Sequence, residues 1–272
     1  MPVYTDQTGR TVDISATPSR IVSLVPSQTE LLSTLGLDEQ VVGITKFCVY
    51  PQHWFRTKTR VGGTKTVHPE IIDALQPDLI LANKEENVKE QVESLAEKYP
   101  VWISDVHDLD SALAMMEQFG FMTGTSEKAT RLIIDIKNRF SALPAIHHKI
   151  PTAYLIWRNP YMTIGGDTFI HDMLHRCGLQ NVFGHLPRYP AVTIEELKAC
   201  QLLLLSSEPY PFKQQHIDEL LAQLPGTTIL LTDGELFSWY GSRLLHAPAY
   251  FAALLRQVHN FDQHDIYFRP GQ

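Results

Sequence analysis

The feature that most constrains the fold is an alternation of short apolar runs with helical patterns, which occurs twice along the chain. In the first half the apolar runs cover residues 21–25, 41–44, 79–82 and 101–104. The helical patterns between them cover residues 27–35, 68–75 and 88–98. Strands separated by helices predict βαβ units and a largely parallel sheet. A hairpin is expected ahead of them, with residues 3–5 and 11–14 flanking a turn.

A different pattern occupies the middle of the chain. Helical periodicity dominates residues 109–143 and is broken only around 120–125. Leu132, Ile136 and Phe140 fall on one helix face, and Pro144 ends the pattern. A helix over 126–143 would span about 27 Å at 1.5 Å per residue, long enough to run from one lobe to another.

After this helix the alternation resumes. Strands are expected at 152–157, 202–206 and 228–232, and helices at 168–176, 193–199, 214–221 and 248–257. The halves share local patterns, because residues 70–76 and 195–201 each place a glutamate in the first turn of a short helix that leads into a strand. We therefore predict an α/β fold of two similar, Rossmann-like lobes: an N-terminal lobe at 1–125, a bridging helix at 126–143 and a C-terminal lobe at 144–272.

Composition excludes several classes of function. The net charge is -7 and Lys and Arg are scattered, which argues against nucleic acid as a partner. No apolar run approaches the length needed to cross a bilayer, so no membrane insertion is expected. The N-terminal residues are polar and do not resemble an export signal, which predicts either a cytoplasmic protein or a processed form. The 3 cysteines lack metal-ligand spacing and imply no disulfide framework.

Candidate binding residues follow from the expected strand ends, since ligands of open α/β sheets bind outside the carboxyl ends of the strands. The candidates are Ser27, Cys48, Lys65, Trp157, Arg158, Tyr210, Phe212, Trp239, Tyr240 and Arg243. A cleft lined by these aromatic rings suits a large, flat, partly apolar ligand. The two arginines suit carboxylate, phosphate or amide groups on it. The alternative is that some of the rings pack the core of a lobe.

Three further groups of residues have competing interpretations. Ser27 and Glu30 match a capping box, which predicts a helix start and leaves amides that could face an anionic ligand group. Glu70 and Glu195 occupy equivalent first turns, where they either complement a helix dipole or dock onto basic pockets of a symmetric dimer. His171 and His175 could share a metal, but no third ligand accompanies them, so we interpret them as surface histidines and expect no metal site.

The sequence shows none of the common motifs of enzyme active sites. The sequence contains no nucleophile elbow, no phosphate-binding loop of the Walker type and no dinucleotide fingerprint after a strand. The chain is therefore expected not to be an enzyme and to hold no resident cofactor.

The ordered motifs resemble a known family. The segments 20–32, 68–81 and 178–183 are similar to the opening, the helix–strand unit and its second-lobe counterpart in class III binding proteins of cobalamin, haem and iron-siderophore importers. Segments 47–48, 205–212 and 234–241 resemble the cobalamin-binding branch. The resemblance implies two lobes bridged by one helix, a ligand in the cleft between them, and Glu70 and Glu195 as the residues that engage the permease.

The resemblance sets out the functions to be compared. The first is a monomeric, periplasmic receptor that delivers a cobalamin-like corrinoid, or another metal chelate such as haem or a ferric siderophore, to the permease dimer of an ABC importer. The second is a cytosolic carrier or sensor of a corrinoid or tetrapyrrole that works without a transporter. The third is a metallo-enzyme, which would require Cys48 and a histidine to converge.

Overall fold

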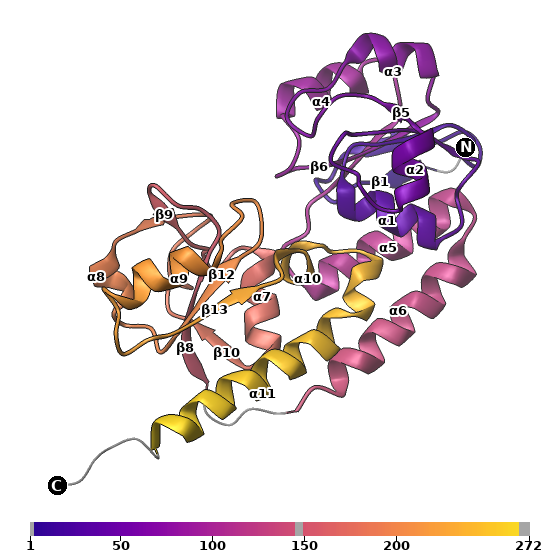
Figure 1. The fold of residues 1–272 in the computed structure, drawn as a ribbon. Helices are drawn as coiled ribbons and strands as arrows, with labels where there is room; N and C mark the ends of the chain where they lie inside the picture. The colour runs from indigo at the N-terminus through magenta and orange to yellow at the C-terminus, as the bar shows by residue number, and fades with distance from the viewer. Residues whose placement is uncertain (1–2, 145–148, 267–272) are drawn as a thin grey trace, which may run out of the picture. The chain divides into compact units, whose positions relative to one another are not determined.

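The chain forms two compact units. The computed structural model describes residues 3–144 and 149–266, and for 259–266 only the backbone (Figure 1). Unit 1 runs to Ile136 and also includes Tyr240–Arg243, whereas unit 2 runs from Lys137 to Trp239 and resumes at Leu244. The predicted lobe boundaries had placed Tyr240–Arg243 in the second half, but the contacts of this segment group it with the first.

Unit 1 is built on a five-stranded parallel sheet of order β5-β4-β3-β6-β7. Its strands are β3 (Ile21–Ser23), β4 (Val41–Ile44), β5 (Thr59–Arg60), β6 (Leu79–Asn83) and β7 (Val101–Ser104). Every residue of β3, β6 and β7 is buried, which explains why these strands read as continuous apolar runs. The hairpin β1 (Val3–Thr5) and β2 (Thr11–Asp13) precedes the sheet.

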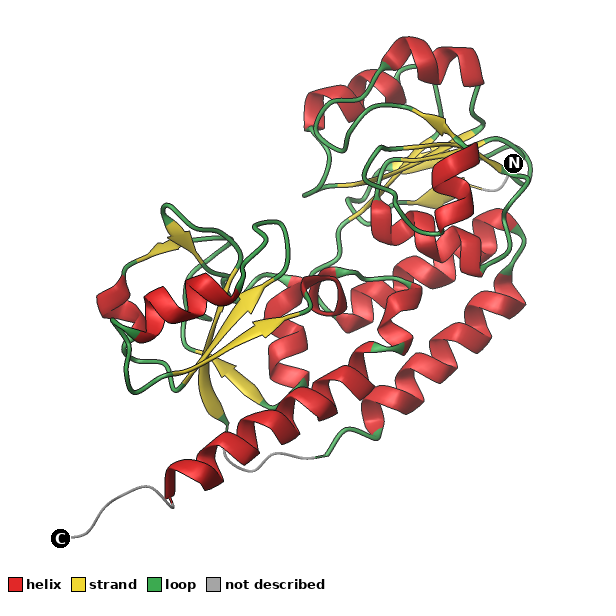
Figure 2. Cartoon of the chain, in the orientation of Figure 1, coloured by secondary structure: helices red, strands yellow, loops and turns green. Residues whose placement is uncertain are grey.

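Helices cover both faces of this sheet (Figure 2). One face packs against α3 (Pro69–Leu75) and α4 (Lys89–Ala96) in a cluster that includes Ile72, Val92 and Ile80. The other face meets α1 (Pro26–Thr34) and α5 (Leu109–Thr123), where the rings of Trp102 and Phe119 lie 5.4 Å apart. A short helix that the sequence analysis missed, α2 (Gln52–Thr57), connects β4 to β5.

A single helix, α6 (Ser126–Ser141), carries the chain out of unit 1. The division between the units falls within it, after Ile136. Its predicted apolar face is confirmed, since Leu132, Ile136 and Phe140 are all buried. In unit 2 the Phe140 ring packs 6.3 Å from that of Phe251.

Unit 2 is built on a four-stranded parallel sheet of order β10-β8-β12-β13. Its strands are β8 (Ile150–Leu155), β10 (Leu179–Asn181), β12 (Leu202–Ser206) and β13 (Thr228–Thr232). The antiparallel pair β9 (Tyr161–Met162) and β11 (Ala191–Val192) lies outside this sheet.

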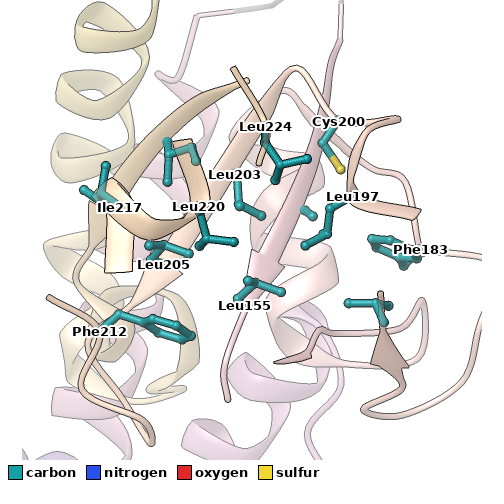
Figure 3. Close-up of a cluster of buried hydrophobic side chains, with 13 residues drawn as sticks. Leu155, Phe183, Leu197, Cys200, Leu203, Leu205, Phe212, Ile217, Leu220 and Leu224 are labelled. Carbon is teal, nitrogen blue, oxygen red and sulfur yellow. The ribbon is translucent and has the colours of Figure 1, made fainter. Parts of the chain in front are cut away.

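The helices of unit 2 also divide between two faces. Side chains from α8 (Ile194–Leu197) and α9 (Gln214–Leu221) pack with Leu155, Leu203 and Leu205 in one core cluster (Figure 3). The opposite face meets α7 (Phe169–Arg176), α10 (Gly234–Ser238) and α11 (Ala247–Ile266). There the Phe237 ring contacts both Tyr154 and Phe251, at centroid distances of 5.2 and 4.6 Å.

The two sheets repeat one topology. Strands β4-β3-β6-β7 of unit 1 stand in the same order and orientation as β10-β8-β12-β13 of unit 2. The preceding helices correspond as well, because α3 leads into β6 and α8 leads into β12. The predicted α/β class with two similar, mainly parallel halves is confirmed. Among the described residues no helix combines the length and apolarity of a bilayer-spanning segment.

Candidate functional site

In each unit the parallel strands end at one side of the sheet, which we call the carboxyl edge. In unit 1 the loop after β4 presents the most exposed apolar side chains of this edge. Phe47 is 51% exposed, Val49 39% and Tyr50 41%. None of these three residues is among the binding residues predicted from the sequence, although Phe47 lies in a segment that resembles the cobalamin-binding branch. The available signal was the short apolar run 47–50, which begins three residues after the end of the strand.

Cys48 anchors this loop from the inside. Its sulfur lies 3.1 Å from both the Thr29 and the Thr45 hydroxyl oxygens, and the residue is fully buried. Burial raises the pKa of the Cys48 thiol above its ordinary value. The structure therefore places this predicted binding residue in the interior, where it fixes the backbone between two outward-facing neighbours.

The start of α1 differs from the prediction. The helix begins at Pro26 with Val25 as N-cap, and no side chain caps it, so the predicted capping box of Ser27 and Glu30 is wrong. Glu30 is instead engaged by a residue distant in sequence: the Arg243 guanidinium donates to its carboxylate at 2.7 and 3.0 Å. Ser27 is buried at 3% exposure.

The segment Tyr240–Arg243 lies against this carboxyl edge of unit 1. The Tyr240 hydroxyl donates to Glu86 at 2.7 Å. Burial, reinforced by the nearby Glu86 carboxylate, raises the pKa of Tyr240 well above its ordinary value, so the phenol stays protonated and keeps donating. A Cβ on Gly241 would lie 2.7 Å from the Ser27 carbonyl oxygen, so only glycine allows this close approach.

Two cations complete the edge of unit 1. The Arg243 guanidinium stands over the Tyr50 ring, 4.6 Å from its centroid. Exposed Lys65 donates to the Glu85 carbonyl oxygen at 2.7 Å. Of the five predicted binding residues in this unit, Arg243 and Lys65 are the two that are not buried.

In unit 2 the carboxyl edge carries an aromatic cluster. Trp157 follows β8 and is 42% exposed. Its ring meets that of Tyr210 edge-on at 5.7 Å, and Tyr210 meets Phe212 at 4.8 Å. Phe212 is only 5% exposed and belongs to the core cluster of Figure 3, which is the packing role considered as the alternative to binding. Trp157 and Tyr210 are therefore the rings of this cluster that remain accessible.

Charged groups hold the neighbouring side chains in place. Arg158 donates to Glu219 at 2.5 Å. The hydrogen bond between Arg158 and Tyr210 and, to a smaller extent, the charge of Glu219 raise the pKa of the Arg158 guanidinium above its ordinary value. The Trp239 indole donates to Glu208 at 3.1 Å and is 9% exposed. Four residues predicted to bind ligand therefore lie in one cluster centred on Tyr210: Trp157, Arg158, Tyr210 and Phe212.

The two glutamates predicted to dock onto a transporter are both exposed. Glu70 lies in the first turn of α3, 3.5 Å from the His68 ring, with 71% of its side chain accessible. Glu195 lies in the first turn of α8, 2.5 Å from the Lys198 ammonium, with 80% accessible. The adjacent Glu196 accepts hydrogen bonds from the backbone and the side chain of Thr193, and these bonds lower the pKa of the Glu196 carboxyl. Glu196 therefore caps the helix, whereas the Glu195 side chain faces outward.

The paired histidines of α7 differ in their surroundings. His171 is half-buried beside Asn181, 3.2 Å away, whereas His175 is exposed. Burial, with a smaller contribution from His175, lowers the pKa of His171. In the described part of the chain, no group of three or more His, Cys, Asp or Glu side chains is arranged to hold a metal ion.

Comparison with known proteins agrees with this architecture. The family described as "Periplasmic binding protein" matches residues 21–222. The chain is 26% identical to the vitamin B12-binding protein of Pectobacterium carotovorum subsp. carotovorum (strain PC1), over 85% of this chain and 86% of that protein.

Two solved structures share the fold. The periplasmic vitamin B12-binding protein of Vibrio cholerae superposes with a TM-score of 0.72 at 20% identity, over 89% of this chain and 98% of that one. The periplasmic haem-binding protein of the same organism gives 0.75 at 20% identity, over 87% and 98%. The matched span covers most of both α/β units, and on this basis the chain belongs to the periplasmic binding protein family.

Proposed function

We propose that this protein is a periplasmic, monomeric receptor that binds a cobalamin-like corrinoid or a related metal chelate and delivers it to an ABC importer. The observation that carries the proposal is the accessible Trp157 ring. It is 42% exposed at the carboxyl edge of unit 2, yet Tyr210 holds it edge-on. A rigid, accessible indole is suited to covering the flat face of a large ring system.

Unit 1 supports the same class of cargo. Phe47 and Tyr50 expose aromatic surface at its own carboxyl edge, the edge at which open α/β sheets bind ligands. Tetrapyrroles and corrinoids offer apolar faces that aromatic side chains cover well, with polar groups at the periphery. The similarity to a vitamin B12-binding protein and to a haem-binding protein favours this chemistry over a small hydrophilic solute.

The transport step would use the exposed carboxylates. Glu70 and Glu195 occupy first turns of equivalent helices, one in each unit, as expected of two contacts with a symmetric permease dimer. A binding protein of this kind performs no chemistry on its cargo and needs no resident cofactor. The chelate should therefore be recovered from the complex with its mass and absorption spectrum unchanged.

Titration of the purified protein with cobalamin, cobinamide, haem and a ferric siderophore tests the proposal. Binding is followed by intrinsic fluorescence, because Trp157 is far more exposed than Trp54, Trp102 and Trp239, which are 0%, 0% and 9% exposed. We expect saturable quenching by a corrinoid at micromolar or lower concentration. The absence of saturable binding by all four chelates would refute the proposal.

Delivery is tested separately with the reconstituted importer. The double variant Glu70→Ala, Glu195→Ala should keep the cargo affinity of the wild type but lose stimulation of the importer's ATPase. The matched control is Glu90→Ala, Glu93→Ala, which removes two exposed carboxylates of α4. Equal stimulation of the ATPase by the docking variant and the control would refute docking and would show that Glu70 and Glu195 only complement the dipoles of their helices.

A further inference from the structure

The exposed Tyr50 ring is held by a group that lies 193 residues later in the chain. Its loop is fixed underneath by Cys48, whose sulfur contacts two threonine hydroxyls at 3.1 Å. From above, the Arg243 guanidinium stands 4.6 Å from the Tyr50 centroid. Even so, the ring remains 41% exposed. It is thus supported by a cation without being covered.

Arg243 is itself fixed by Glu30. Two guanidinium nitrogens, Nε and Nη2, donate to the two carboxylate oxygens at 3.0 and 2.7 Å, a bidentate geometry that sets the plane of the guanidinium as well as its position. The side chains of Arg243 and Glu30 are only 15% and 23% exposed, so water screens the pair weakly. Glu30 lies on α1, and the residues on either side of it, Thr29 and Leu31, are buried in unit 1.

From this arrangement we infer that Glu30 and Arg243 are positioning residues, which hold the Tyr50 ring as a surface for stacking the cargo. A tyrosine on a loop otherwise samples several rotamers, and ordering it on binding would weaken affinity. A guanidinium stacked on one face restricts the ring before the cargo arrives. The inference rests on the proposed binding of a flat chelate and assigns to these two residues an effect on affinity without contact with the cargo.

The bond between Glu30 and Arg243 also bears on the roles predicted for these two residues from the sequence. Arg243 was predicted to bind carboxylate, phosphate or amide groups of a ligand, but its donors at Nε and Nη2 are engaged by Glu30. Glu30 was predicted to cap α1, and that cap is absent. The missing cap and the engaged guanidinium have one physical basis, which is the bond between Glu30 and Arg243 beside Tyr50.

A double-mutant cycle tests this assignment. Arg243→Met removes the cation but keeps an unbranched side chain similar to the aliphatic part of arginine, and Tyr50→Ala removes the ring. With the tightest-binding of the four chelates, Arg243→Met should raise Kd about two- to tenfold, the range expected when one side chain that was held in place must instead be ordered on binding. In the Tyr50→Ala background the same change should alter Kd less than about twofold, because no ring remains to be positioned.

Controls separate positioning from general stability. Arg176→Met removes another half-buried pair, with Asp172 at 2.7 Å on α7, and should leave Kd unchanged. Glu30→Gln retains an acceptor for the guanidinium and serves if Arg243→Met does not fold; its effect on Kd should also vanish without Tyr50. An equal loss of affinity with and without the Tyr50 ring would overturn the inference while leaving the proposed function intact. Failure of the wild type to bind any chelate would instead refute the proposed function.

Discussion

Trp157→Ala provides the most direct measure of how much the exposed aromatic surface contributes to binding. A tryptophan side chain presents up to roughly 250 Å². The exposed 42% of Trp157 then corresponds to about 100 Å² of mainly apolar surface. At about 25 cal/mol per Å², complete coverage by cargo would contribute about 2.5 kcal/mol, and half coverage about 1.3 kcal/mol. The expected result is a Kd raised roughly 10- to 70-fold.

The assay must not depend on the residue that is removed. Calorimetric titration, or the visible absorption of the bound chelate, measures Kd in both proteins without tryptophan emission. Phe121→Ala is the matched control, because this ring is 52% exposed near the C-terminal end of α5, away from the carboxyl edge. Unchanged affinity in Trp157→Ala, or an equal loss in Phe121→Ala, would refute the reasoning that assigns Trp157 to the binding surface.

Four further predictions follow from the burial and contacts of particular residues. Trp157→Phe should abolish most acrylamide quenching of the native protein, since the other three tryptophans are at most 9% exposed; quenching that persists would show that another indole is accessible. Cys48, Cys177 and Cys200 should resist a thiol reagent at pH 8 until denaturant is added, because burial raises their pKa values, to about 12 for Cys177 and about 11 for Cys200; rapid labelling of the folded protein would contradict this. Gly165→Ala should lower Tm by several degrees, because the new Cβ would stand 2.2 Å from the Leu186 carbonyl oxygen, whereas Gly226→Ala, with nothing within 4 Å, should leave Tm nearly unchanged. The hydrogen bonds from His53 and Trp54 lower the pKa of Asp38, so the stability they provide is present above its ordinary pKa of 3.8 and is lost as pH falls through the lowered value; Asp38→Asn should remove this acid dependence in urea denaturation.

The sequence predicted most accurately several short strands of the two parallel sheets. The limits of β4, β7 and β12 were predicted to the residue, because each is a continuous apolar run bounded by polar or turn residues. Helix α2 was missed because its one buried side chain, Trp54, is fixed by Asp38, a partner outside the helix. Amphipathic periodicity cannot reveal a helix of six residues that is anchored in this way.

The candidate site was predictable in its location but not in the role of each side chain. Trp157 and Phe212 both follow strands of one sheet, yet the first is 42% exposed and the second 5%. The rule that ligands bind at carboxyl edges identifies the loops, whereas burial depends on where each loop turns. The capping box at Ser27 failed for a related reason, since a bond to Arg243 competes for the Glu30 carboxylate and has no local signature.

The division of the chain between Trp239 and Tyr240 has a simple chemical basis. The loop after β6 carries Glu86, and the loop after β12, its equivalent in unit 2, carries Glu208. Glu86 accepts from Tyr240 at 2.7 Å, and Glu208 accepts from Trp239 at 3.1 Å. Two consecutive aromatic residues thus bond to corresponding carboxylates of different units. Because each bond is local to its own unit, the change from unit 2 to unit 1 falls between these two residues.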